Sequence, residues 1–213
     1  GVSARVAQIV YDYFHWEGSP MGTNRLEAFS DGVMAIIITI MVLELEVPHS
    51  PSLAAIANLW PTFFSYLLSF IYVGIYWNNH HHMMQAAQKV TGGVLWSNLH
   101  LLFWLSLLPF TTGWMGENEF DRLPTMLYGI NLLLCAVAYY VLEHKIIVAD
   151  GKDSLIAHAI GADFKGKVSP FLYILGIGST WFVAPWAGLI FFVSVTVLWL
   201  KPDTRIAEAL GDD

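Results

Sequence analysis

Polar side chains stand directly in front of the most apolar run of this sequence. Arg25, Ser30 and Asp31 precede residues 33–43, in which Thr39 is the one polar residue. A carboxylate at the centre of a membrane helix costs about 2.5–3.5 kcal/mol on insertion scales, and less near a helix end. Asp31 is therefore interpreted either as a charge in water at the membrane interface or as a group bonded to neighbouring helices.

Candidate partners lie in two later segments, 75–84 and 95–112. If successive helices cross in alternating directions, the start of the first, the end of the second and the start of the third meet at one membrane surface. The resulting hydrogen-bonded cluster would fix helix packing, since its members have no water alternative. Its predicted members are Arg25, Ser30, Asp31, Trp77, Asn79, His80, His81 and Asn98.

This cluster is predicted to be structural. Neighbouring helix positions point about 100° apart, so His80, His81 and His82 cannot chelate one ion, whereas zinc sites use spacings such as i and i+4. The sequence has no GxxxxGK[ST], GxGxxG or HExxH motif, and no serine or cysteine in a recognisable nucleophile setting. We expect no enzymatic activity, no cofactor and no tightly bound metal.

The first apolar segment also has a face without anchoring groups. At 100° per residue, Asp31 points roughly opposite this face. Packing in a bundle core is one interpretation, and a pore is the other. The residues sharing the face are Phe29, Gly32, Ile36, Thr39, Ile40 and Leu43.

Three features favour the pore. The face carries large branched residues with one hydroxyl layer, where tight membrane packing would use small residues. Glu44 and Glu46 follow at the outer end, where acidic rings attract cations. In a symmetric assembly, rings of Ile36, Ile40 and Leu43 would form a dewetting constriction, with Thr39 as its oxygen layer.

The composition predicts the membrane that this interpretation needs. The 213 residues are 56% hydrophobic and 13% charged, about half the charged share of a soluble domain. The net charge of -7 argues against a nucleic-acid partner. A single cysteine, Cys135, excludes an intrachain disulfide.

We predict an all-α, polytopic protein with six transmembrane helices, because about 20 helical residues cross a bilayer. The predicted spans are 28–47, 53–79, 90–115, 125–147, 169–183 and 186–200, within a channel domain over residues 21–213. With both termini in the cytoplasm, Arg122 is the one basic residue of the domain that falls outside. Residues 1–20, which end in Gly-Ser-Pro before Met21, are predicted to be an expression-derived or N-terminal segment.

Ordered motifs give this pattern a family resemblance. RLEAFSDG (25–32) fits an RxxxFSDG signature at the start of the first span, and WNNHH (77–81), LWSNL (95–99) and SLLPF (106–110) fit its companion patterns. From Arg25 to about Lys201, the sequence resembles the prokaryotic members of the transmembrane protein 175 potassium-channel family.

The resemblance implies a potassium-selective leak-type channel without a TVGYG filter, in a bacterial inner (plasma) membrane. It implies a homotetramer whose central pore is lined by the first helix. Ile36 matches the narrow gate, although Ile40 is the alternative, and Leu43 matches a further hydrophobic layer. Thr39 matches the selectivity layer, near which potassium would bind transiently. The motif residues Arg25, Phe29, Ser30, Asp31 and Gly32 match the group that contacts the second and third helices.

Two other functions remain open from the sequence. A secondary transporter of a cation or small solute usually has broken helices, and the first span has no Gly or Pro between Val33 and Val47. A non-conducting membrane scaffold is the second alternative.

Overall fold

The computed structural model describes residues 22–154, 156–157 and 164–200, and every regular element in this part of the chain is an α-helix. The predicted segment 1–20 lies outside the described residues. In the described residues, the predicted all-helical class is confirmed. The helices are α2 (Thr23–Leu43), α3 (Leu53–Ala57), α4 (Trp60–Ala86), α5 (Gly92–Ser106), α6 (Leu108–Glu117), α7 (Arg122–Asp150), α9 (Phe164–Phe182) and α10 (Pro185–Leu200).

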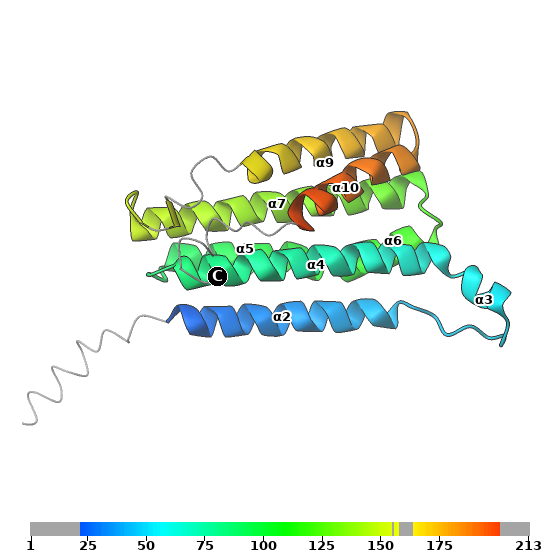
Figure 1. Cartoon of the computed structure of the whole chain (residues 1–213), viewed down its shortest axis with the longest axis horizontal. Helices are drawn as coiled ribbons and strands as arrows, with labels where there is room; N and C mark the ends of the chain where they lie inside the picture. The colour runs from blue at the N-terminus through cyan, green and yellow to red at the C-terminus, as the bar shows by residue number, and fades with distance from the viewer. Residues whose placement is uncertain (1–21, 155, 158–163, 201–213) are drawn as a thin grey trace, which may run out of the picture.

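The long helices lie side by side as a bundle, with α2 at one edge and the α9–α10 hairpin at the other (Figure 1). Helix α2 packs against α4, α5 and α6, while α7 packs against α5, α9 and α10. The start of α2 and the ends of α4 and α7 lie at the same end of the bundle (Figure 1). This arrangement leaves α2 with neighbours on one side only.

Helix α7 provides the centre of the core. Its inward positions recur at helical spacing, which buries one stripe against α5 and another against α9. These side chains are fully buried: Tyr128, Leu132, Cys135, Ala138, Leu142 and Ile146.

Proline and capping residues explain several helix boundaries. Pro61 lies in the first turn of α4, and Pro109 in the first turn of α6, where a missing N–H is tolerated. Pro109 therefore divides the predicted third span into α5 and α6. At Thr91 the side-chain oxygen accepts a 3.4 Å hydrogen bond from the Val94 N–H and caps α5. Helix α7 ends at Asp150 and is capped by Gly151, whose φ of 100° is unfavourable for other residues.

The observed helices differ from the predicted spans mainly at their ends. Helix α2 begins and ends before the predicted 28–47 span does. The predicted 53–79 span contains the short α3 and then α4, which continues to Ala86. The continuation matters because it places His80 and His81 within a regular helix.

Three helices of the described part of the chain are long and apolar enough to cross a membrane: Thr23–Leu43, the α5–α6 pair Gly92–Glu117, and Arg122–Asp150. Helix α10 is apolar but shorter. The count of six spans and the location of the termini remain predictions.

Candidate functional site: the two faces of α2

Helix α2 is divided along its length into a packed face and an open face. Its buried residues follow one another at steps of three and four, as the side of a helix facing a bundle does. They are Leu26, Ser30, Met34, Ile37 and Met41. The residues of the predicted pore face are all exposed in the single chain, and we call this set the open face: Phe29, Gly32, Ile36, Thr39, Ile40 and Leu43.

Two side-chain contacts join α2 to α4. The Trp77 indole N–H donates a hydrogen bond of 3.0 Å to the Asp31 carboxylate. One turn away, the Glu27 carboxylate contacts the His81 ring, which also stacks on the Trp77 ring with a centroid distance of 6.2 Å. On α2, Glu27 and Asp31 are four residues apart, and on α4 their partners Trp77 and His81 are also four apart. The two contacts therefore require antiparallel helices in a fixed register.

A third helix is tied in by a buried chain of hydrogen bonds. The Ser30 hydroxyl donates to the Leu26 carbonyl at 2.9 Å and accepts from the Asn98 amide at 2.9 Å. The Asn98 carbonyl then faces His80 Nε2 at 2.8 Å. Since Ser30 has donated its only proton, Asn98 must present its NH₂ group to Ser30 and its oxygen to His80.

The chain of bonds also assigns the form of His80. Because the Asn98 oxygen can only accept, the proton of His80 lies on Nε2. In the neutral ring, Nδ1 is then an acceptor, and it has no partner among the described residues. Ser30, His80 and Asn98 are all fully buried, so this chain fixes the relative positions of α2, α4 and α5. We call these three, with Glu27, Asp31, Trp77 and His81, the anchor.

Two predicted members do not join the anchor. Asn79 lies on another side of α4: its side-chain amide donates to the Ile75 carbonyl, and its backbone carbonyl accepts from the Tyr139 hydroxyl. Arg25 is exposed at the start of α2, and within the described residues its guanidinium makes no hydrogen bond to the anchor. Their predicted places in one cluster with Asp31 are therefore not what the structure has.

The open face contains one hydroxyl group among apolar side chains. Ile36 is 58% exposed, Ile40 43% and Leu43 79%, so the protein's own core covers none of them. The Thr39 hydroxyl donates to the Ile36 carbonyl at 2.9 Å. Having donated its proton to the helix, this oxygen presents its lone pairs outward, as an acceptor of the kind that a cation binds. Gly32 also borders open space, since an added Cβ would meet no atom within 4 Å.

The two predicted outer-mouth carboxylates lie beyond the last helical turn of α2. Glu44 caps the helix and its side chain lies against Gly113 of α6. Glu46 is exposed in the segment that follows. An open groove runs between α2 and α6, and Ile36, Ile40 and Glu44 line one side of it while Phe110 and Trp114 line the other.

Sequence reasoning missed Glu27, the α2 partner of His81. The available signal was its spacing of four residues before Asp31. It also missed a polar layer inside the bundle, where the Ser69 hydroxyl lies 2.6 Å from that of Thr112 and 3.0 Å from that of Tyr128. In the described residues, no three His, Cys, Asp or Glu side chains are grouped to hold a metal.

The chain matches known proteins over most of its length. The family model described as endosomal/lysosomal potassium channel TMEM175 matches residues 25–109. A protein of Chryseobacterium sp. (strain P1-3), named a potassium channel, is 50% identical over 193 residues, which cover 91% of this chain and all of that protein. A potassium channel of Chamaesiphon minutus is 29% identical and covers 81% of this chain and 92% of its own length.

The fold also matches a solved structure. A crystal structure described as a lysosomal potassium-selective channel TMEM175 homolog from Chamaesiphon minutus superimposes with a TM-score of 0.75 at 26% identity. The match covers 85% of this chain and 97% of that one.

Proposed function

Because the chain belongs to the TMEM175 potassium-channel family, we propose that it conducts potassium ions passively across a membrane, through a pore lined by α2. The observation that carries the proposal is the division of α2: an anchored face holds the helix, and an uncovered apolar face carries one hydroxyl group. An isolated subunit would leave this apolar face in contact with water or lipid, whereas a ring of subunits turns it toward an axis.

Four copies of the chain would surround the pore in a homotetramer. Rings of Ile36, Ile40 and Leu43 would then form hydrophobic constrictions that close the path by excluding water. Either Ile36 or Ile40, both exposed on α2, would form the narrower ring. Between them, Thr39 would offer four outward oxygen atoms to a dehydrating potassium ion. Glu44 and Glu46 would concentrate cations at the outer end.

The proposed membrane arrangement is six spans with both termini in the cytoplasm, in the plasma membrane of a bacterium. Helices α2, α5–α6 and α7 supply three spans by length and composition. Helix α4, with 27 residues, is also long enough to span, and its polar end carries the anchor. The anchor would lie near the cytoplasmic surface and the acidic segment after α2 near the outer surface.

Flux measurements separate this function from the alternatives. Purified protein is reconstituted in vesicles loaded with potassium and diluted into sodium, and a proton ionophore provides the balancing current. If the protein is a channel, potassium efflux drives rapid proton uptake. Vesicles with valinomycin in place of the protein show proton uptake in the same direction and serve as the positive control. A slow, saturating flux that needs a coupled solute would identify a transporter, and absence of flux in vesicles that contain folded protein would identify a scaffold.

A further inference from the structure

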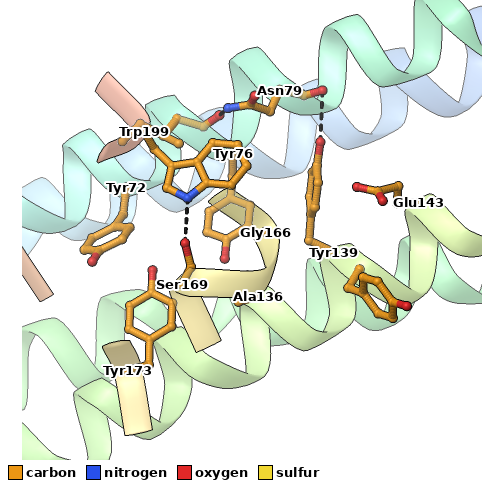
Figure 2. Close-up of a pocket in the computed structure, with 12 residues that line it drawn as sticks. Tyr72, Tyr76, Asn79, Ala136, Tyr139, Glu143, Gly166, Ser169, Tyr173 and Trp199 are labelled. Atoms are coloured by element: carbon orange, nitrogen blue, oxygen red, sulfur yellow. Dashed lines mark hydrogen bonds between the residues drawn. The ribbon is translucent and has the colours of Figure 1, made fainter. Parts of the chain in front are cut away.

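A cavity of about 50 Å³ lies between α4, α7, α9 and α10, and no residue of α2 lines it (Figure 2). Helical spacing brings its lining together. Tyr72, Tyr76 and Asn79 follow one face of α4, and Ala136, Tyr139 and Glu143 follow one face of α7. A single water molecule needs about 10–15 Å³ of such space, so the cavity admits a small group rather than a large ligand.

Aromatic rings form most of the cavity wall. The Tyr76 and Tyr139 rings meet edge to face with centroids 5.9 Å apart, and the Tyr72 and Tyr173 rings lie 6.4 Å apart. Trp199 of α10 closes one side. The face of an aromatic ring is electron-rich and attracts cations, especially where water is excluded.

Several hydrogen-bond donors of the wall are already used within the protein. The Tyr72 hydroxyl donates to the Phe192 carbonyl at 2.6 Å, and the Tyr139 hydroxyl donates to the Asn79 carbonyl at 3.3 Å. The Trp199 indole N–H donates to the Ser169 hydroxyl at 2.8 Å (Figure 2). These three donors already have acceptors within the protein, whereas a ligand that brings a positive charge would meet the aromatic rings of the wall.

The wall also contains a carboxylate. Glu143 is 7% exposed and its carboxylate points toward the side of the Tyr139 ring (Figure 2). A carboxylate can accept from several donors at once, so a bound ammonium group would share Glu143 with the partners that this side chain already has within the protein. The Lys165 ammonium group, whose residue precedes the lining residue Gly166, lies 5.6 Å from the centroid of the Trp199 ring, so this ring already takes part in one cation–π contact.

We propose that this cavity is a binding site for a small organic ammonium group, held by the tyrosine and tryptophan ring faces and by Glu143. The ammonium group belongs either to a soluble amine or to a lipid headgroup, which share this chemistry. The site is separate from the open face of α2. The test therefore reads binding alone, and its result does not depend on whether the protein conducts potassium.

The test compares choline with 3,3-dimethylbutan-1-ol, which has the same shape without the charge. Ligand-observed NMR titration of the purified full chain gives both affinities. We expect choline to bind about tenfold more tightly than the neutral alcohol, because cation–π attraction and the carboxylate act on the charge alone. Equal affinities, or no saturable choline binding, would overturn the proposal.

Variants locate the binding. Glu143→Gln should weaken choline binding about threefold, because the ring faces still attract the charge, and leave binding of the alcohol unchanged. Ala136→Phe fills the cavity and should remove binding of both ligands, while Val137→Phe, the next residue on the outer side of α7, should not. Choline binding that survives both Glu143→Gln and Ala136→Phe would place it elsewhere. Size-exclusion profiles check that each variant is folded, and Ala136→Phe serves if Glu143→Gln is not.

Lipid composition distinguishes the two sources. In nanodiscs of phosphatidylglycerol alone, choline should bind with the affinity that it has in detergent. Addition of phosphatidylcholine should weaken apparent choline binding severalfold if the lipid headgroup enters the cavity. An unchanged affinity assigns the site to soluble amines, and failure of choline to bind in both lipids contradicts the proposal.

Discussion

The Asp31 carboxylate accepts a hydrogen bond of 3.0 Å from the Trp77 indole, although Asp31 stands two residues before the most apolar run of the chain. The same register of the antiparallel helices brings Glu27 to His81. Two carboxylates on α2 thus meet two aromatic donors on α4 at matching spacing. This relationship explains how polar residues can precede the proposed pore run: they attach the helix to its own subunit and leave the opposite face free.

Asp31→Ala is expected to impair assembly more than conduction. The change leaves the Trp77 N–H without its acceptor, which costs about 1 kcal/mol for a partly exposed group. Asp31→Asn keeps an oxygen in place and serves as the matched control. Size-exclusion chromatography measures the fraction of protein in the proposed tetramer, and flux per surviving oligomer measures conduction. A stable tetramer with normal yield in Asp31→Ala would contradict this role.

Asn98→Ala is expected to lower the stability of the subunit. The substitution removes the donor to Ser30 and the acceptor for His80 in one step, and both remaining groups are fully buried. Leaving a buried polar group unpaired costs about 1–3 kcal/mol. Thermal unfolding followed by tryptophan fluorescence should show a lower midpoint. Asn118→Ala is the control, because among the described residues the Asn118 side-chain amide bonds only the Trp114 carbonyl of the preceding helix α6. An equal shift in both variants would argue against the buried chain.

Helical spacing alone explains why the division of α2 into two faces was predictable. The spacing of Ser30 and Ile36 along the helix places them on different sides of it, so Ser30 is buried and Ile36 is exposed. The partners on α4 were harder to predict from the sequence, because adjacent helical residues such as Asn79 and His80 point about 100° apart. Which of them meets α2 depends on how α4 packs between α2 and α7. Glu27 was missed for the same reason, since its contact follows from the register of two helices.

The predicted helix ends differ from the observed ones for a different reason. Hydropathy reports where a chain is apolar, but a helix continues wherever its backbone bonds are made, so α4 extends past its apolar part to Ala86. The division at Leu107 follows from Pro109 and was readable from the sequence. The cavity between α4, α7, α9 and α10 had no sequence signal, because it combines residues from four helices.

Gly188→Ala is expected to destabilise the α9–α10 hairpin. A Cβ at Gly188 would collide with the Thr180 hydroxyl and lie 2.7 Å from the Gly176 carbonyl oxygen. Small residues such as glycine allow membrane helices to pack with their backbones this close. Gly178→Ala is the matched control, since its Cβ would meet nothing within 4 Å. We expect a loss of about 1–3 kcal/mol for Gly188→Ala alone, seen as a lower unfolding midpoint, and equal midpoints would show that the hairpin adjusts.

Thr39→Ala is expected to reduce the preference for potassium over sodium. The outward lone pairs of the Thr39 oxygen are the one set of side-chain acceptors on the open face, and alanine removes them. Loss of about 1 kcal/mol of discrimination corresponds to about a fivefold change in the permeability ratio. Thr39→Ser retains the hydroxyl and should keep the ratio. Reversal potentials in mixed potassium and sodium measure it, and an unaltered ratio in Thr39→Ala would place selectivity elsewhere.

Ile36→Asn is expected to raise potassium conductance. A ring of isoleucine side chains excludes water from a narrow pore, and a ring of amides would hold it. If that barrier falls by about 1.4 kcal/mol, the single-channel current rises about tenfold. Val42→Asn is the control, because Val42 is exposed on α2 but lies off the open face. Ile40→Asn, measured beside it, decides the narrower ring: the position with the larger increase is the gate. Unchanged currents in both isoleucine variants would mean that this face of α2 does not limit the flow.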